Sequence, residues 1–454
     1  MLTYELKKAP GVPLYEALYR CIRQDIQSGK LSAGEKLPSK RALAQHLKVS
    51  NITVETAYNQ LLSEGFLTSR EKIGYFVAVD AHPLSHTPVE EIPEIPHPAV
   101  LDLTTNSPAH FPFSVWSKLQ REVFLDLGEK LLQPVESQGC LALRQAIADH
   151  LSAFRGMAVH PNNIVIGAGS DILYHLLMPL LGLDKIYAVE EPGYEKIRKI
   201  YAAGGVECAY APMDEWGVQP EKLGAAQVLH ISPSHHFPTG LVTPVRRRQE
   251  LLDWAQQADG YIIEDDYDSE FRFFAHPMPA LHSMDRRGRV IYMNSFSKSL
   301  TPAIRISYMV LPDGLMETFR EKLSFYSGTV ASFEQYTLAR FLSRGYFEKH
   351  INRMRKFYKS RRDKVVATLT GCPWRDKITI CEQDAGLHFL VQVDTKLTDA
   401  ALVDIWARQG ILVQPLSSFY HGGNPSVAGT LVVNYSGLDE KELWRLSTLP
   451  EGIP

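Results

Sequence analysis

Cysteine is scarce in this sequence, and the few cysteines present follow no recognisable spacing. Cys21, Cys140, Cys208, Cys372 and Cys381 include no CxxC pair, and their number is odd. This pattern argues against a disulfide scaffold, and we expect ordinary reduced thiols.

Long apolar runs are also missing. No run reaches the about 18 residues that a membrane helix requires, and the N-terminus, MLTYELKKAP, has no signal-peptide core. We therefore expect a cytoplasmic protein. The sequence shows neither internal repeats nor low-complexity segments.

Neither sign of charge dominates. The 48 Lys and Arg against 51 Asp and Glu give −3, which argues against a bulk polyanion binder. Residues 1–80 carry eleven basic and eight acidic residues, a modest excess of +3 that alone proves no nucleic-acid binding. At 454 residues the chain is too long for one ordinary domain.

The first 80 residues predict three helices followed by a hairpin. A periodic apolar segment runs from Pro13 to Gly29, a second helix starts at Ser39, and Ser50 caps a third that ends at about Ser63. Two short helices across a tight turn are typical of a helix-turn-helix, whose last helix enters the major groove. Strands at 66–68 and 75–77 would form a wing. A protein-binding winged helix is the alternative.

These residues resemble the GntR class of bacterial winged-helix regulators. The resemblance is carried by KLPSKRALAQHLKVSNITVETAYNQLLSEGFL and by GYFV in the wing. It implies contacts with DNA bases or phosphates by Arg41, Ser50, Asn51, Thr53, Tyr58 and Lys72. Asn51 stands where an arginine is usual and Glu55 adds a negative charge, which leaves the operator sequence open.

Residues 81–99 form a proline-rich linker, with five prolines in nineteen residues. Such a segment is expected to be extended and to reach up to roughly 60 Å at ~3.1 Å per residue. We therefore divide the chain into a DNA-binding domain at 1–80, this linker, and an effector domain at 100–454.

Residues 100–454 alternate apolar strands with amphipathic helices, a pattern that predicts an α/β fold with a mainly parallel sheet. Ligands of such sheets gather beyond the carboxyl ends of the strands. Polar clusters follow several of the predicted strands at that position, so we expect the ligand site there.

The segment Asn294–Arg305, NSFSKSLTPAIR, follows the apolar residues 290–293. Lys298 could form a Schiff base with an aldehyde, while Ser295, Ser297 and Arg305 hold that aldehyde's phosphate. Burial and a nearby cation would be needed to make this amine nucleophilic. A surface turn is the alternative.

Two further strand ends suggest ligand contacts. Gly169, Ser170 and Asp171 lie between a strand and a helix, where backbone amides attract phosphate. Tyr194 lies on a Pro-Gly turn and could stack on a planar ring. A structural glycine turn and a tyrosine that packs on the sheet edge are the alternatives.

An acidic run, Glu264-Asp265-Asp266-Tyr267-Asp268, follows another buried strand. Carboxylates there are costly unless a cation matches them. A pyridinium nitrogen would be such a cation, with Asp265 beside it and Tyr267 donating to the ring's phenolate oxygen. A solvated acidic face and a magnesium site are the alternatives, although no phosphate-binding GxxxxGK[ST] motif accompanies the run.

His235 and His236 suggest a metal, but no third ligand lies at a recognisable spacing. We therefore interpret them as loop histidines and predict no metal site.

The parts together are those that pyridoxal 5′-phosphate requires. Residues 100–450 resemble the fold-type-I aminotransferases, with EEPGY, PTG, EDDYDSEF and SFSKSLTPAIR in the expected order. The resemblance implies a large and a small domain, Lys298 as the Schiff-base lysine, Asp265 and Tyr267 on the ring, and Tyr194 stacking. It places Arg305, Ser295, Ser297 and Ser170 on the phosphate.

The whole chain is similar to the MocR subfamily of regulators, yet two positions depart from aminotransferases. Phe237 replaces the asparagine before Pro-Thr-Gly, and Val432 occupies the position of the arginine that holds the substrate carboxylate. Lys196 is a candidate substitute carboxylate partner. These departures favour a sensor over an efficient enzyme, with at most slow partial transamination.

We therefore expect a homodimeric regulator that binds operator DNA under the control of pyridoxal phosphate, or of an amine or amino acid that forms an external aldimine with it. An active aminotransferase with a vestigial head and a purely structural nucleic-acid binder are the alternatives.

Overall fold

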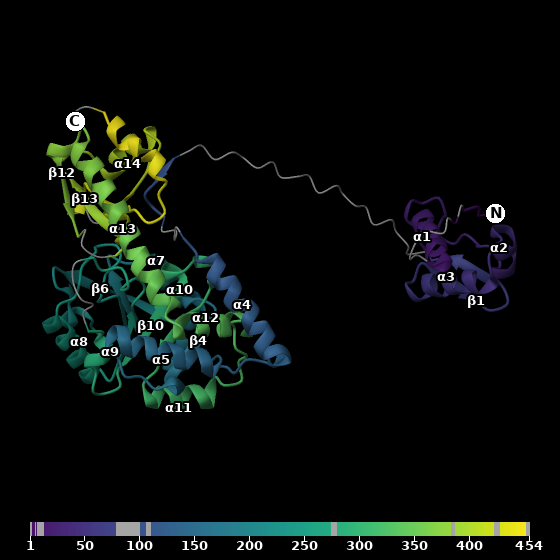
Figure 1. Ribbon diagram of the computed structural model, residues 1–454, viewed down its shortest axis with the longest axis horizontal. Helices are drawn as coiled ribbons and strands as arrows, with labels where there is room; N and C mark the ends of the chain where they lie inside the picture. Colours follow the sequence, from purple (N-terminus) through teal and green to yellow (C-terminus); the bar gives the residue numbers. More distant parts are fainter. Residues whose placement is uncertain are drawn as a thin grey trace. The chain divides into compact units, whose positions relative to one another are not determined.

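The computed structural model describes residues 2–4, 6, 13–78, 100–105, 110–273, 279–382, 386–421 and 427–450 (Figure 1). The chain forms two compact units, Met1–His97 and Pro98–Pro454. The predicted linker at 81–99 lies outside the described residues. Across the described ranges, no helix combines the length and the apolar character that a membrane crossing needs.

The N-terminal unit is a winged helix. It consists of α1 (Leu14–Gln27), α2 (Lys40–Leu47), α3 (Asn51–Ser63) and the antiparallel strands β1 (Leu67–Arg70) and β2 (Gly74–Val77). Ser39 and Ser50 accept the backbone N–H of Ala42 and Thr53, and so cap α2 and α3. Lys48 is left-handed with φ 52°, which turns the chain sharply between the two helices.

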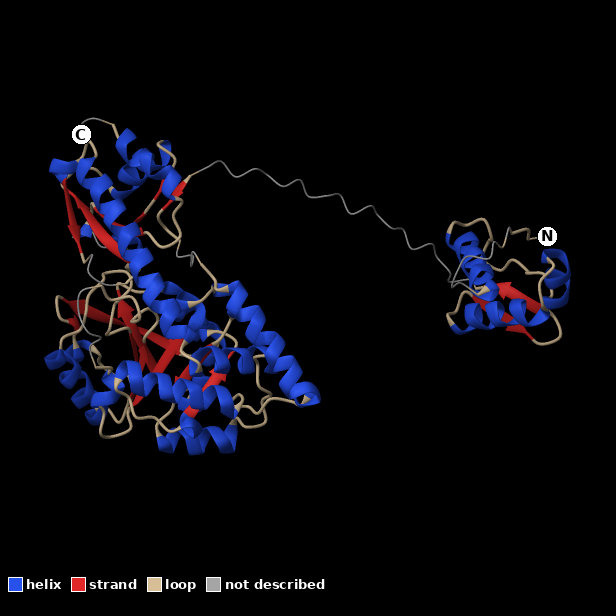
Figure 2. Cartoon of the chain, in the orientation of Figure 1, coloured by secondary structure: helices blue, strands red, loops and turns tan. Residues whose placement is uncertain are grey.

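The C-terminal unit is built on a mixed eight-stranded sheet with the order β4-β11-β10-β9-β8-β5-β6-β7. Only β11 and the short edge strand β7 run against the others (Figure 2). The strands are β4 (Ile164–Gly167), β5 (Ile186–Glu191), β6 (Glu207–Asp214), β7 (Gly217–Val218), β8 (Val228–Ile231), β9 (Tyr261–Asp265), β10 (Val290–Ser295) and β11 (Ser307–Val310). The predicted α/β fold with a mainly parallel sheet is confirmed.

Helices cover both faces of this sheet because its strands bury side chains on both sides. Ile164 and Ile166 of β4 pack with α5 (Leu141–Arg155) and α12 (Ser332–Ser343), whereas Val165 packs with α6 (Ser170–Leu181) and α11 (Asp313–Lys322). The remaining helices of this part are α4 (Phe113–Leu127), α7 (Glu195–Ala203), α8 (Val245–Gln257), α9 (Leu281–Met284) and α10 (Phe296–Ser299).

The long helix α13 (Tyr346–Gly371) connects this sheet to a smaller antiparallel one (Figure 1). The order of the small sheet is β12-β13-β16-β15, and α14 (Asp399–Arg408) lies beside it. Its strands are β12 (Ile378–Cys381), β13 (His388–Val393), β15 (Gln414–Pro415) and β16 (Thr430–Asn434). A parallel pair of β3 (Leu101–Asp102) with β14 (Ile411–Leu412) joins the first described residues of the unit to this part.

Candidate functional site: a pocket at the strand ends

A cavity of about 350 Å³ lies at the carboxyl ends of the parallel strands. Because β11 runs antiparallel, its first residues reach the same edge, where Ser307 pairs with both Ser295 and Gly167. The cavity is lined by Thr104, Ser170, Asp171, Tyr174, Glu190, Tyr194, Lys196, Ile197, Ser232, Phe237, Asp265, Tyr267, Ser295, Ser297, Lys298, Arg305 and Asn434. Of the cofactor-binding residues predicted from sequence, Gly169 alone is outside this lining set.

Lys298 lies on α10, the single helical turn that follows β10. Burial lowers the pKa of this lysine, and the Asp268 carboxylate acts in the opposite direction. Beside it, the Ser295 hydroxyl accepts the N–H of Ser297 and donates to the Ser297 hydroxyl at 3.0 Å. The turn therefore presents an amine with a lowered pKa next to two hydroxyl groups, as a Schiff-base lysine needs.

The end of the cavity near α6 has the features of an anion site. Ser170 is the first residue of α6, where free backbone N–H groups and the helix dipole favour negative charge. Gly169 adopts φ 93°, and a Cβ atom there would lie 2.2 Å from Nη2 of Arg305. Only glycine therefore lets the arginine lie against this turn.

Lys196 lies at this same end. Its Nζ is 2.8 Å from Oδ2 of Asp171, the oxygen that lies 3.5 Å from Nη2 of Arg305. The proposal that Lys196 holds an effector carboxylate therefore gains no support from its position, because the lysine stands with the phosphate candidates.

The acidic run at the end of β9 is divided among three environments. Glu264 accepts the backbone N–H groups of Leu281 and His282, both at 2.8 Å. In the core, Oδ2 of Asp266 forms an ion pair with Nη2 of Arg155 at 3.0 Å and accepts a hydrogen bond from the Tyr292 hydroxyl at 2.6 Å. Asp265 is the member of this trio that lines the cavity.

Two residues that sequence reasoning missed hold the Asp265 carboxylate. The Tyr174 hydroxyl donates to Oδ2 of Asp265 at 2.6 Å, and Nε2 of His230 lies 3.5 Å from the same oxygen. The Tyr201 hydroxyl lies 2.8 Å from the other nitrogen of His230. Tyr174 and His230 sit within an apolar helix and an apolar strand, so the sequence gives no signal that distinguishes them from core residues.

Aromatic side chains also line the cavity. Tyr194 is half exposed, and its ring meets the Phe237 ring edge-on with centroids 6.0 Å apart. Tyr267 lies deeper, with its hydroxyl 3.3 Å from Nδ1 of His235. Burial and the nearby carboxylates raise the pKa of Tyr267 well above its usual range, so this phenol keeps its proton and can donate.

The two departures from the aminotransferase pattern lie in one apolar cluster. Val432 is buried in β16 with Leu390 and Leu416, and Phe237 packs against this group. Asn434, two residues further along β16, lines the cavity instead. The position expected to hold a substrate carboxylate is therefore apolar.

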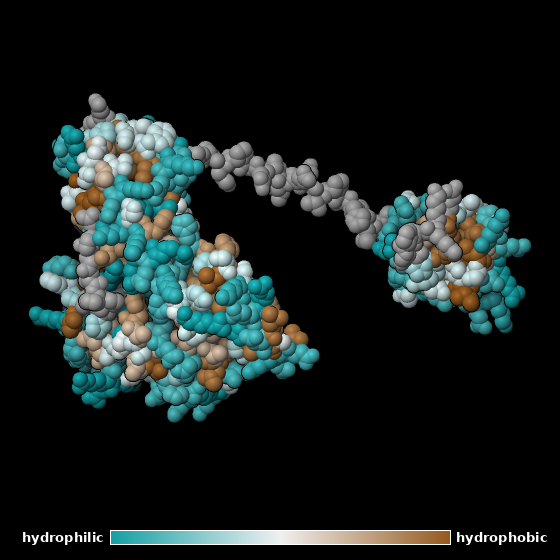
Figure 3. Space-filling view, in the orientation of Figure 1, coloured by the Kyte–Doolittle hydropathy of each residue, from teal (hydrophilic) through white to brown (hydrophobic). Residues whose placement is uncertain are grey.

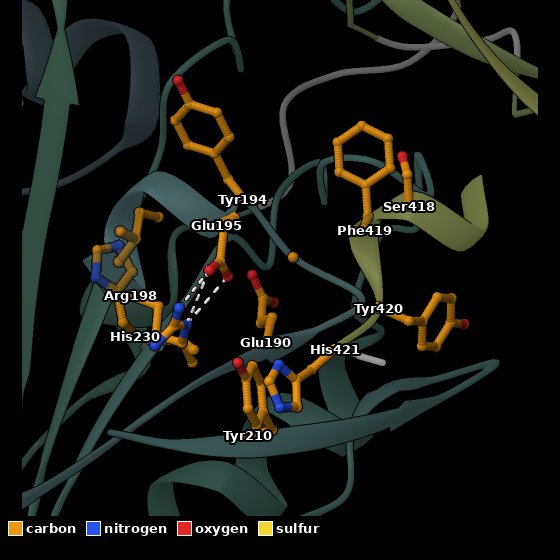
Figure 4. Close-up of a pocket in the computed structure, with 13 residues that line it drawn as sticks. Glu190, Tyr194, Glu195, Arg198, Tyr210, His230, Ser418, Phe419, Tyr420 and His421 are labelled. Atoms are coloured by element: carbon orange, nitrogen blue, oxygen red, sulfur yellow. Dashed lines mark hydrogen bonds and ion pairs between the residues drawn. The ribbon is translucent and has the colours of Figure 1, made fainter. Parts of the chain in front are cut away.

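A second cavity of about 240 Å³ adjoins the first and shares Glu190, Tyr194 and Ile197 with it. Figure 4 shows Glu190 pointing into this space, with the Glu195–Arg198 ion pair on one side and the stacked rings of Tyr210 and His421 below. Burial raises the pKa of Glu190 well above its usual range. The adjoining space gives room for a ligand larger than the first cavity holds.

The lining residues fit pyridoxal phosphate. The cavity has an amine, a ring-nitrogen carboxylate, a phenol donor and an anion cradle that a Cβ atom at Gly169 would fill. When bound, the cofactor supplies an aldehyde that condenses reversibly with primary amines. Lys298 would hold it covalently, Asp265 would face its ring nitrogen, and Arg305 with Ser170, Ser295 and Ser297 would bind its phosphate.

Most of the predicted DNA contacts are accessible on the winged helix. Arg41, Ser50, Asn51 and Lys72 are exposed, and Lys72 stands at the tip of the wing with φ 62°. The Ser50 hydroxyl also caps α3, and Thr53, its partner there, is partly buried. Glu55 forms an ion pair with Lys40, so its charge on this helix is partly neutralised.

Tyr58 requires a correction. Its side chain is fully buried, and its hydroxyl donates to the carbonyl oxygen of Pro38 at 3.0 Å. The prediction that Tyr58 contacts DNA is therefore wrong for this conformation. Tyr58 faces the core together with Val54 and Leu61, and its hydrogen bond to Pro38 links α3 to the residues just before α2.

Comparisons with known proteins agree with both units. Residues 14–77 match the model of bacterial regulatory proteins of the gntR family, and residues 98–447 match aminotransferase class I and II. The chain is 35% identical to the HTH-type transcriptional regulator YdeL of Bacillus subtilis, with 97% of each chain covered. It is 32% identical to the probable rhizopine catabolism regulatory protein MocR of Rhizobium meliloti, with 99% of this chain and 94% of MocR covered.

Among solved structures, the chain is similar to a multiple substrate aminotransferase from Thermococcus profundus. The identity is 24% and the TM-score 0.68, over 78% of this chain and 90% of that one. This likeness establishes the aminotransferase fold of the C-terminal unit. The winged helix, the aminotransferase body and the full-length relatives agree: the chain belongs to the MocR-type subfamily of gntR-family transcriptional regulators.

Proposed function

We propose that this chain is a transcription regulator whose winged helix binds operator DNA under the control of pyridoxal phosphate and a primary amine in the strand-end pocket. The observation that carries the proposal is that Lys298, Asp265 and Arg305 line one cavity in a chain that also carries a DNA-binding unit. The cofactor is the attachment point, and the amine, or the cofactor itself, is the signal.

The chain's own residues account for each part of this binding. Lys298 has a lowered pKa because it is buried, which favours the neutral, nucleophilic amine. Tyr174 and His230 hold the Asp265 carboxylate toward the cavity. Tyr267 keeps its proton and would donate a hydrogen bond to a ring oxygen of the cofactor.

Regulation is favoured over steady catalysis by the apolar cluster around Val432 and Phe237. A substrate carboxylate finds no arginine at this position, so the orientation that rapid transamination requires is missing. An active aminotransferase with a vestigial head is the alternative. It predicts sustained turnover of an amino acid with a keto acid that is unchanged when residues 1–80 are deleted.

We further propose that the regulator is a cytoplasmic homodimer. The C-terminal unit exposes large apolar side chains on and near α4, where Figure 3 shows hydrophobic surface. Phe113, Phe124, Leu125 and Leu132 are 48–77% exposed, more than an isolated subunit of this size would favour. A dimer would present two heads to paired half-sites. Ligand binding at the pocket would couple to this presentation.

The proposal is tested by two measurements on the wild type, Lys298→Ala and the control Lys322→Ala, which changes an exposed lysine of α11. A spectral titration with candidate amines follows the cofactor, and a gel shift on the operator follows DNA binding. We expect Lys298→Ala alone to lose borohydride trapping of the cofactor and the effect of ligands on the gel shift. Identical ligand responses in all three proteins would show that the pocket does not control DNA binding.

A further inference from the structure

A second cluster of side chains lies behind Tyr267 and is not used by the proposed regulation. His235 follows β8, Asp268 follows β9, and His388 begins β13 of the small sheet. One potential ligand atom of each residue lies within 4.8 Å of the others. Within the described ranges, this is the only group of three or more histidine, cysteine or carboxylate side chains placed in this way.

The three side chains are almost completely buried, which is unusual for polar groups. His235, Asp268 and His388 are 3%, 2% and 1% exposed. Nε2 of His235 has no hydrogen-bond partner among the described residues, and the His388 ring has only the backbone of Pro238 nearby as an acceptor. Buried polar atoms of this kind are rare in native proteins and ask for an unseen partner.

Neighbouring residues hold the cluster in place. Nδ1 of His235 lies 2.9 Å from Oδ2 of Asp268, and the rings of His235 and His388 have centroids 4.7 Å apart. A Cβ atom at Gly386 would lie 1.8 Å from Cε1 of His235. Only glycine therefore lets the His235 imidazole pack against the backbone two residues before His388. His236 does not belong to the cluster, because its Nδ1 lies 2.7 Å from the Thr239 hydroxyl.

We propose that His235, Asp268 and His388 form a binding site for a divalent transition-metal ion, with Zn²⁺ as the best match. Two imidazoles and one carboxylate are a ligand set that zinc accepts, with a fourth position left for water. Tetrahedral bonds of about 2.0–2.2 Å place two ligand atoms about 3.3–3.6 Å apart. Ligand atoms that lie up to 4.8 Å apart would therefore move together by at most about 1.5 Å when the ion binds.

The site would join two parts of the C-terminal unit. His235 and Asp268 lie in loops that follow strands of the large sheet, whereas His388 belongs to the small sheet and pairs with Asn434 of the pocket lining. An ion bound by all three would hold the small sheet against the large one beside Lys298. None of the three ligands lines the cofactor cavity, although Asp268 acts on the pKa of Lys298 and His235 lies 3.3 Å from the Tyr267 hydroxyl.

Zinc binding to the untagged full-length protein, stripped with a chelator, tests the site by equilibrium dialysis and elemental analysis. We expect about one zinc ion per wild-type chain, and an affinity at least roughly tenfold weaker in His388→Gln and Asp268→Asn. The control is His46→Gln, which changes an exposed histidine of the winged helix and leaves the stoichiometry unchanged. Circular dichroism without zinc checks that each variant folds.

A second measurement depends on no substitution. Co²⁺ added to the wild type gives visible absorption bands whose intensity reports a four-coordinate site, and competing Zn²⁺ removes them. The proposal is overturned if the wild type binds less than stoichiometric zinc at about 100 µM, or if His388→Gln and Asp268→Asn bind zinc as tightly as the wild type. It is also overturned if Co²⁺ gives no bands beyond those of the free ion. Loss of cofactor binding in Lys298→Ala would leave the zinc result unchanged, so the two proposals fail separately.

Discussion

The Tyr174 hydroxyl donates a 2.6 Å hydrogen bond to Oδ2 of Asp265, and both buried residues line the strand-end cavity. The tyrosine comes from α6 and the aspartate from the end of β9, so the contact crosses from a covering helix to the sheet. It orients the carboxylate that would face a pyridine nitrogen.

Tyr174→Phe is expected to weaken cofactor binding by roughly tenfold. A hydrogen bond to an ionised group contributes about 1.5–3 kcal/mol, and its loss frees the Asp265 carboxylate to rotate. Tyr187→Phe is the matched control, because Tyr187 packs in the same core cluster and its hydroxyl contacts Gly182 instead. Equal cofactor affinities, measured by fluorescence titration of the two variants, would contradict an orienting role for Tyr174.

Gly169→Ala is expected to displace Arg305 and to lower the affinity for pyridoxal phosphate and for inorganic phosphate alike. The added methyl group would meet the guanidinium at 2.2 Å, and the backbone has φ 93°. Gly205→Ala separates these two effects, since Gly205 has φ 85° with nothing within 4 Å of its Cβ position. Calorimetric titration should show a loss for the first variant and an unchanged affinity for the second.

His150 is expected to make stability depend on pH between about 4 and 6.5. Burial lowers the pKa of His150 to about 4, so the unfolded chain binds a proton that the folded chain rejects. The free energy of unfolding should therefore fall by about 3 kcal/mol as the pH drops from 6.5 to 4. Urea denaturation of His150→Leu should show a shallower dependence, while the exposed His160→Gln should follow the wild type.

The winged helix offers a pair of substitutions with opposite outcomes. Tyr58→Phe removes the hydrogen bond to Pro38 and should cost about 1 kcal/mol of stability with little change in operator affinity. Arg41→Ala should leave stability unchanged, weaken operator binding, and reduce the salt dependence of binding by about one phosphate contact. Thermal unfolding and binding isotherms at several salt concentrations distinguish the two, and the reverse result would place Tyr58 at the DNA.

Much of this molecule could be predicted from local pattern. Ser39 and Ser50 mark helix starts because an N-terminal cap is a local contact, in which the serine hydroxyl accepts the backbone N–H of the residue three positions later. Lys298 and Asp265 could be found because each lies at or shortly after the end of an apolar strand, and strand ends converge at one sheet edge. Tyr58 was misassigned because its DNA contact came from the family resemblance alone, whereas the rotation of this short helix against its core, set by packing, buries Tyr58 with Val54 and Leu61.

Residues that depend on tertiary contacts could not be found in this way. Tyr174 and His230 have the periodicity of core residues, and the fold alone brings them to Asp265. His235 and His388 are separated by more than 150 residues, so no spacing rule could connect them. The sequence shows that Val432 occupies the position of the arginine that holds the substrate carboxylate in aminotransferases. The apolar cluster found there instead could not be predicted, because it forms by packing with Phe237 and Leu416.

Asp171 has a consequence for which anions the pocket accepts. Its carboxylate already offers one negative charge to both Arg305 and Lys196. A singly charged ion such as chloride gains little by competing with a tethered group of equal charge. A phosphate ester with two charges would attract Arg305 and Lys196 more strongly than this single carboxylate does. The Asp171 carboxylate therefore competes with free anions for Arg305 and Lys196, and we expect it to exclude singly charged ions from this site.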